Sequence, residues 1–301
     1  MDFVHLQCQS EYSVKNSLVR ISKLIDSVKE AGMKSVALTD DMSLFSAIKF
    51  YQKATSAGIK PIIGAKIYVD FDLGHYDVLL LCQNHEGYLN LSELISKAYL
   101  NEQGISIVSV TEEQLISHQK GLLMIATPIS SDVSQLLLAN ELELAHTKAK
   151  NWQAIFKDRY YISAQRTDRH SDENLLNLTI ELGLKLDIPV VATNDVQFLS
   201  KSDYDAHEAR ICIAEGGLLD DSRRLKFFSN SQYLKTADEM SELFKDYPQL
   251  IANASEVAKR CNLHFKLFEK NYLPAFPTPK GKSIAEFFSE ESNKGLQIRL
   301  K

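Results

Sequence analysis

The feature that most constrains the fold is a repeated alternation between short apolar runs and longer segments with apolar residues at helical spacing. The runs Val78–Cys82 and Pro189–Thr193 consist almost entirely of apolar side chains, which is typical of strands buried on both faces of a sheet. Segments such as 18–28 place Leu, Ile and Val three or four residues apart, as an amphipathic helix does. At least six strands, each followed by a helix, favour parallel pairing and an α/β architecture, either a barrel or an open sheet.

These elements can be assigned along most of the chain. The predicted strands are 3–8, 35–39, 60–69, 78–82, 121–126, 159–163 and 189–193. The predicted helices are 18–31, 43–57, 84–100, 112–118, 131–140, 141–156 and 172–186, and helices dominate again from 202 to 261. After three prolines between 274 and 279, a helical pattern resumes from 283 to 300.

Composition narrows the functional class. Thirty-four Lys and Arg residues against 39 Asp and Glu give a net charge of −5, which argues against a nucleic-acid-binding module working alone. The four cysteines, Cys8, Cys82, Cys212 and Cys261, show no CxxC spacing, which favours a reducing compartment and disfavours structural zinc. No signal-peptide pattern and no apolar run of the roughly 20 residues needed for a membrane span is present, so we expect a cytoplasmic protein without a membrane partner.

The first predicted strand has an unusual polar face. Alternate residues of a strand share a face, so His5, Gln7 and Gln9 face one way while Leu6 and Cys8 face the other. A polar row on a strand that is otherwise buried is typical of a pocket wall.

Further polar residues stand at the ends of the predicted strands, where α/β folds carry their sites. With the polar row they form one candidate rim: Gln7, Gln9, Asp40, Asp41, Lys66, Asp77, Thr167, Asp195 and Gln197. The alternative is that each residue is simply a solvated loop residue, since strands run into polar loops. The joint pattern favours a site, because Asp40-Asp41 and Asn194-Asp195 each close a buried apolar strand.

Five ordered motifs carry a resemblance to a known family: Phe3–Ser13, Ala37–Asp41, Gly58–Ala65, Pro189–Val196 and Asp205–Glu208. They are similar in order and spacing to the N-terminal polymerase and histidinol phosphatase (PHP) domain of the bacterial replicative DNA polymerase III alpha subunit. The resemblance implies an α/β fold, a distorted (β/α)7 barrel over residues 1–270. It also implies that residues 271–301 are a linker and the first helix of a polymerase core that lies outside this chain.

The departures from the family pattern predict the state of the site. Metal-binding members resemble this chain but carry His at positions matching Gln7, Gln9, Asp41, Asp77, Thr167 and Gln197, and Glu at the position matching Lys66. Only at Asp40 and Asp195 does this chain carry the same residue as the metal-binding members. Carboxamides are weak ligands compared with imidazole, and an ammonium within about 4–6 Å of a cation disfavours it. We therefore expect no metal and no catalytic residue in this region, and we expect Lys66 to pair with Asp41 or Asp77.

Two histidines lie close to the family motifs. His5 lies one step before the positions that match the family's ligand pair, and His207 lies on a predicted helix in a family motif. A structural role is favoured over a ligand role for both, with His5 hydrogen-bonded inside the barrel.

Two functions follow from the resemblance. The first is a catalytically degenerate scaffold of a DNA-directed DNA polymerase, which contacts the remainder of the polymerase core and docks the proofreading exonuclease (epsilon) subunit. DNA and Mg²⁺ would then be bound by the core rather than by this region. The alternative is a residual metal-dependent phosphoesterase or 3′–5′ exonuclease, which would rest on Asp40, Asp195 and His207 alone.

Overall fold

The computed structural model describes residues 3–71, 74–101, 107–221, 223, 226–267, 269, 274 and 276–300. The chain divides into two compact units, Met1–His264 and Phe265–Lys301. The predicted boundary between residues 270 and 271 lies outside the described residues.

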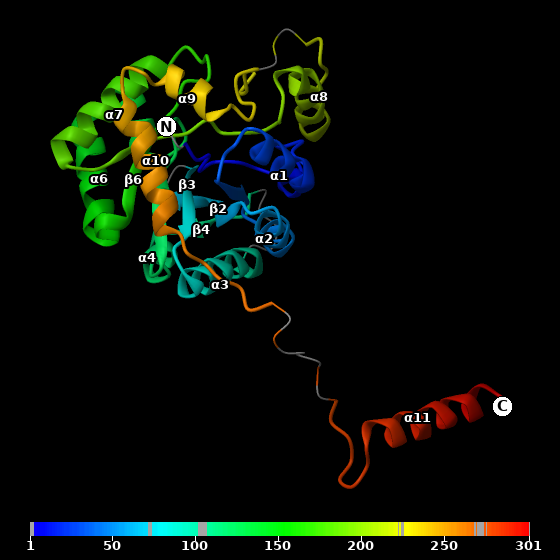
Figure 1. Ribbon diagram of the computed structural model, residues 1–301. Coiled ribbons are helices and arrows are strands. Elements are labelled where there is room, and N and C mark those ends of the chain that lie inside the picture. Colours follow the sequence, from blue (N-terminus) through cyan, green and yellow to red (C-terminus); the bar gives the residue numbers. More distant parts are fainter. Residues whose placement is uncertain are drawn as a thin grey trace. The chain divides into compact units, whose positions relative to one another are not determined.

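The first unit is built on one curled, mixed sheet (Figure 1). Its strands are β1 (Ser35–Asp41), β2 (Lys60–Phe71), β3 (Gly74–Cys82), β4 (Val110–Thr111), β5 (Leu122–Ala126), β6 (Tyr160–Ala164) and β7 (Val190–Ala192). The strand order is β1-β2-β3-β5-β6-β7, and β4 pairs with β2. The β1–β2, β5–β6 and β6–β7 pairs are parallel.

Strand β3 corrects the all-parallel expectation. It runs antiparallel to both β2 and β5. The predicted strands 60–69 and 78–82 extend to Phe71 and Gly74, so too few residues separate them for the crossover that a parallel return requires. The first residues of β3 therefore stand at the same end of the sheet as the last residues of β2 and β5, and this brings Asp77 to the rim.

The N-terminal segment closes the gap between the two ends of the sheet. The predicted strand 3–8 is not a regular strand, since only Cys8 forms a bridge, with Val196. The segment nevertheless bonds on both sides: Ala37 N donates to His5 O at 2.9 Å, and Val196 N donates to Gln7 O at 3.1 Å. It thus lies between β1 and the residues that follow β7, and the prediction of a distorted (β/α) barrel is confirmed.

Helices surround this sheet on its outer side (Figure 1). In the first unit they are α1 (Ile21–Glu30), α2 (Ala47–Ser56), α3 (His85–Asn101), α4 (Glu112–Ser117), α5 (Asp132–Leu138), α6 (Leu142–Phe156), α7 (Asp172–Leu186), α8 (Tyr204–Glu215), α9 (Ala237–Leu243) and α10 (Pro248–Arg260). Short 3₁₀ turns cover Glu11–Ser13, Lys157–Arg159 and Lys201–Asp203. Among the described residues 216–236 no helix is formed, so the helical region predicted from 202 to 261 is interrupted by an irregular segment.

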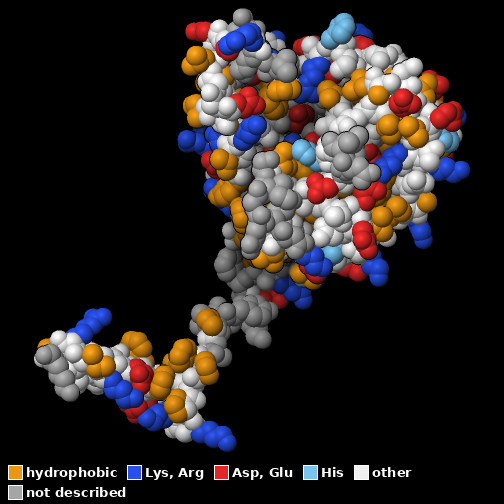
Figure 2. Space-filling model, turned by 180° about the vertical axis from the view of Figure 1, so that it is seen from behind, with side chains coloured by type: hydrophobic (Ala, Val, Ile, Leu, Met, Phe, Trp, Pro, Cys, Tyr) orange, Lys and Arg blue, Asp and Glu red, His pale blue; other side chains and the backbone are white. Residues whose placement is uncertain are grey.

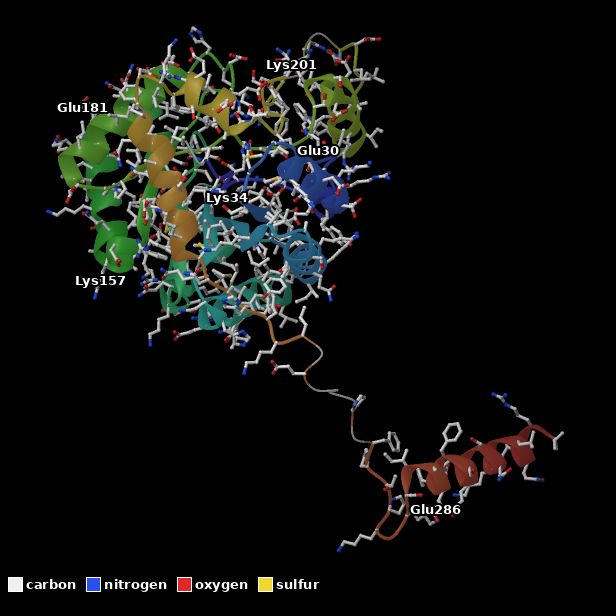
Figure 3. The ribbon with its side chains drawn as sticks, in the orientation of Figure 1. Glu30, Lys34, Lys157, Glu181, Lys201 and Glu286 are labelled. Atoms are coloured by element: carbon white, nitrogen blue, oxygen red, sulfur yellow. The ribbon has the colours of Figure 1, made fainter. Side chains whose placement is uncertain are left out.

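The core follows from the periodicity of these helices and strands. Helix α1 buries Ile21, Leu24, Ile25 and Val28, and burial of each such side chain contributes about 1.5–3 kcal/mol. Charged side chains on the outer faces point away from the sheet, as Glu181 on α7 does in Figure 3. Charges of both signs are interspersed over the face drawn in Figure 2.

Among the described residues of the second unit, one helix is formed, α11 (Ile284–Arg299), which confirms the helical pattern predicted from 283. Ser283 and Glu286 form a capping box at its start, which satisfies backbone N–H groups that have no partner inside the helix. No described residue of α11 is buried. In the described part of the chain, no helix combines the length and apolar character that a bilayer crossing requires.

Candidate functional site

Asp40, at the end of β1, is fully occupied by protein donors. Its carboxylate accepts from Ser10 N at 2.6 Å, Ser10 Oγ at 2.8 Å, Ser13 Oγ at 2.8 Å and Ser46 Oγ at 2.6 Å. The side chain is buried. Four donors fill the main acceptor positions of a carboxylate, so Asp40 ties the N-terminal segment to β1 and α2.

Asp41 carries the ion pair that the sequence predicts. Lys66 Nζ, from the adjacent strand β2, lies 2.8 Å from Asp41 Oδ1, which confirms the predicted pairing of Lys66. Gln9 Nε2 donates to the same oxygen at 2.8 Å, and Asn16 Nδ2 donates to Oδ2 at 2.5 Å. The register that sets Asp41 opposite Lys66 positions the pair.

Lys66 is held in its charged form. Burial alone would lower the pKa of its ammonium, but the carboxylates around it, Asp41 foremost and then Asp77 and Asp195, outweigh burial. The pKa of Lys66 therefore lies well above its ordinary value of 10.5. Its Nζ also lies 5.4 Å from the ring centroid of Tyr68, a distance at which a cation is attracted to the ring face.

Asp195 is surrounded by carboxamides. Gln7 Nε2 and Gln197 Nε2 donate to its Oδ1 at 2.9 and 2.7 Å, and Gln232 Nε2 donates to its Oδ2 at 2.8 Å. Arg169 Nη2 lies 4.0 Å from the same Oδ2. The rim thus brings together residues from the N-terminal segment, from the end of β7 and from the irregular segment before α9.

Asp77 and Thr167 are bonded at the edges of the rim. Asp77 accepts from Thr127 Oγ1 at 2.5 Å and from Ser130 Oγ at 2.9 Å, and burial raises its pKa despite the nearby Lys66 ammonium. Thr167 N and Oγ1 both donate to Asp172 Oδ2, at 2.5 and 3.1 Å. Thr167 therefore bonds the first residue of α7 and not the aspartates at positions 40, 41, 77 and 195.

His5 and His207 both have structural partners. His5 Nε2 donates to Lys235 O at 2.8 Å, and His207 Nε2 donates to Asn16 O at 2.7 Å. Burial lowers the pKa of His5 to about 4 and also lowers that of His207, so both are neutral at pH 7. The predicted hydrogen bond of His5 inside the barrel is confirmed.

The rim residues do not fit a multinuclear metal centre. A carboxylate can only accept hydrogen bonds, so the amide N–H groups of Gln7, Gln9 and Gln197 must face Asp41 and Asp195. A metal ligand would have to present a lone pair there instead. Lys66 already places a positive charge against Asp41. Within the described residues, no group of three or more His, Cys, Asp or Glu side chains is arranged to hold a metal ion.

A cavity of about 420 Å³ opens beside these residues, lined among others by Gln7, Lys66, Asp77, Gln165, Arg169 and Asp195. Of these six lining residues, Gln165 and Arg169 were not predicted as site residues. Gln232, which bonds Asp195, was also missed. Arg169 and Gln232 come from irregular segments without periodicity. Gln165 directly follows β6, and Thr167 was the residue predicted for the site from this segment.

Comparison with known proteins identifies the family of the chain. The PHP domain family model matches residues 5–167. DNA polymerase III subunit alpha of Pseudomonas fluorescens is 42% identical over 301 residues, which is 99% of this chain and 26% of that protein. The subunits of Pseudomonas aeruginosa and Escherichia coli are 39% and 38% identical and are covered to the same 26%.

The chain thus spans about a quarter of the length of the curated relatives that it matches. Because the family model matches more than half of the chain and the relatives are 38–42% identical over 99% of it or more, the chain belongs to the PHP domain family, in the form of the N-terminal PHP region of bacterial DNA polymerase III alpha subunits.

Proposed function

We propose that this region is a catalytically degenerate PHP barrel that serves as a scaffold of a replicative DNA polymerase III alpha subunit and docks the proofreading exonuclease subunit. The parent chain would carry out DNA-directed DNA synthesis in the cytoplasm, with Mg²⁺ and DNA bound by the remaining polymerase core. Helix α11 would pack against that core.

One observation carries the loss of catalysis: a lysine ammonium and carboxamide N–H groups occupy the carboxylate oxygens of the rim. Lys66 bonds Asp41, and the glutamines at positions 7, 9, 197 and 232 bond Asp41 or Asp195. Metal-assisted hydrolysis depends on a bound ion that polarises the substrate or generates hydroxide, and here the oxygens that would hold such an ion have internal partners.

The docking role rests on charge and on family membership. A chain with a net charge of −5 suits a protein partner better than the phosphate backbone of DNA. Because the polar side chains of the rim are bonded to one another, we place the docking surface on the outer helices.

Two measurements test this proposal. The purified 301-residue region is incubated with zinc, manganese and iron, desalted and subjected to elemental analysis, which should find far less than one ion per chain. A stoichiometric ion would favour the hydrolase alternative. Size-exclusion chromatography of the full-length alpha subunit with its cognate exonuclease should show co-elution. A variant with Gln7→Ala and Gln197→Ala should co-elute equally well, because the rim is not the docking surface.

A further inference from the structure

A second cavity lies outside the barrel, between β3, α4, α5 and α6. Its volume is about 380 Å³, and its lining includes Tyr76, Glu112, Asp132, Leu136, Ala139 and Lys148. We call it the α5 cavity. Tyr76 and Asp77 are consecutive on β3 and therefore face opposite sides of the sheet, so the α5 cavity is separate from the rim.

The polar wall of the α5 cavity carries one surplus negative charge. Lys148 Nζ bonds Glu112 Oε1 and lies 3.8 Å from Asp132 Oδ2, so two carboxylates share one ammonium. Tyr76 OH donates to Glu112 at 2.8 Å, and Trp152 Nε1 donates to Asp132 at 2.7 Å. These bonds fix both carboxylates in place.

Apart from Gln135, the rest of the wall is apolar, and exposed leucines follow beyond it. Leu136 and Ala139 line the α5 cavity on the side of α5. Across the α5–α6 turn, Leu137 and Leu142 line a smaller hollow of about 90 Å³. Leu138 and Leu142 are 38% and 44% exposed. Exposed leucines therefore stand on both sides of this turn, beside the negatively charged cavity.

We propose that the α5 cavity receives an apolar side chain from a segment of the docked exonuclease, with a Lys or Arg beside it that pairs with Glu112. The proposal rests on the docking function proposed above. Pockets filled by an anchoring side chain carry most of the binding energy in protein interfaces, and the surplus carboxylate selects a basic neighbour by charge complementarity. A volume of about 380 Å³ has room for a large anchor such as an aromatic side chain.

The test uses the full-length alpha subunit and its purified cognate exonuclease, with affinity measured by calorimetry. Ala139→Trp places a large side chain at the cavity wall, and because Ala139 is exposed the variant should fold. Ala214→Trp is the matched control, since Ala214 is also exposed but lies on α8. We expect Ala139→Trp to weaken binding about tenfold or more, as loss of an interface anchor does, and Ala214→Trp to leave it unchanged.

A charge variant tests the second half of the proposal. Glu112→Gln keeps the shape of the side chain and an acceptor for Tyr76 but removes the surplus charge. Its affinity for the exonuclease should fall, and it should depend less on salt than that of the wild type, because one ion pair of the interface is missing.

The outcomes separate the two proposals. If the wild type binds the exonuclease and Ala139→Trp binds as tightly, the α5 cavity proposal is overturned while docking stands. Equal weakening by Ala139→Trp and Ala214→Trp also overturns it. If the wild type does not bind, both proposals fail. If the affinity of Glu112→Gln depends on salt as strongly as that of the wild type, the proposed pairing of Glu112 with a Lys or Arg of the exonuclease is overturned.

Discussion

At the scale of single residues, Lys66 is the cation that neutralises Asp41 inside the rim. Its side chain and that of Asp41 are only 13% and 14% exposed, so removal of the ammonium leaves a buried carboxylate without its counter-charge. The glutamine and asparagine donors that remain around Asp41 are neutral and cannot replace it.

We expect Lys66→Met to lower the free energy of unfolding by about 3 kcal/mol, because breaking a buried ion pair leaves one charge uncompensated. Urea unfolding followed by circular dichroism measures this loss. The matched control is Lys49→Met, which removes the more exposed Lys49–Glu11 pair, with side chains 47% and 35% exposed. That change should cost at most about 1 kcal/mol. Equal losses in the two variants would contradict the role assigned to Lys66.

His5 makes the stability depend on pH. Its pKa is lowered from 6.5 to about 4 by burial, so between these values the unfolded chain binds a proton that the folded chain does not. Stability therefore falls as the pH drops from 6.5 towards 4, by up to about 1.4 kcal/mol for each unit of pKa difference.

The pH prediction is checked by urea unfolding of His5→Gln at pH 7 and pH 5. The variant should be less stable than the wild type at pH 7, because it loses a packed ring, but it should lose less stability between the two pH values. His85→Asn, at an exposed position on α3, is the control and should retain the slope of the wild type. A wild-type slope in His5→Gln would show that another group is responsible.

At the scale of elements, the β2–β3 hairpin depends on the absence of a side chain at Gly64. A Cβ at this position would lie 2.4 Å from Leu80 O and 2.6 Å from Leu81 Cδ2. Leu81 is the residue that Gly64 pairs with across the hairpin. The carbonyl belongs to the backbone of β3 and cannot move without displacing the strand.

Gly64→Ala should lower the free energy of unfolding by about 1–3 kcal/mol, the usual cost of overpacking a core, and thermal denaturation would report it as a lower melting temperature. Gly295→Ala is the control, because an added Cβ at Gly295 meets nothing within 4 Å and Gly295 lies within α11. This control should leave the melting of the barrel unchanged. A neutral Gly64→Ala would mean that β2 and β3 are not packed this closely.

The elements also differ in how well they could be predicted from the sequence. Apolar runs and helical periodicity predicted most strands and helices, because these patterns report burial directly. The direction of β3 was not predictable from its apolar run, since a strand buried on both faces looks the same in either direction. Segment 3–8 looked like a strand because its side chains alternate, yet its hydrogen bonds are shared irregularly between Ala37 and Val196.

At the scale of the whole molecule, most of the candidate rim could be predicted because the strands of a barrel end on one edge. The fold brings Gln7, Asp41, Lys66 and Asp195 together from distant parts of the sequence. Arg169 and Gln232 were not predictable in the same way. They reach the rim from irregular segments, where position depends on tertiary contacts and leaves no periodic signal.

The last prediction concerns the division into two units. The barrel core is complete within Met1–His264, whereas α11 exposes Ile284, Phe288 and Ile298 by 59%, 72% and 75%. Removal of residues 265–301 should therefore leave the melting temperature of the barrel unchanged. The truncation should also reduce self-association of the chain, because an exposed apolar helix face tends to bind other apolar surfaces. Analytical ultracentrifugation of both chains at several concentrations measures this effect.

Phe288→Glu in the full 301-residue chain is the matched control and should reduce self-association without any truncation. A lower melting temperature after truncation would show instead that α11 stabilises the barrel, and equal self-association of all three chains would exclude α11 as its source.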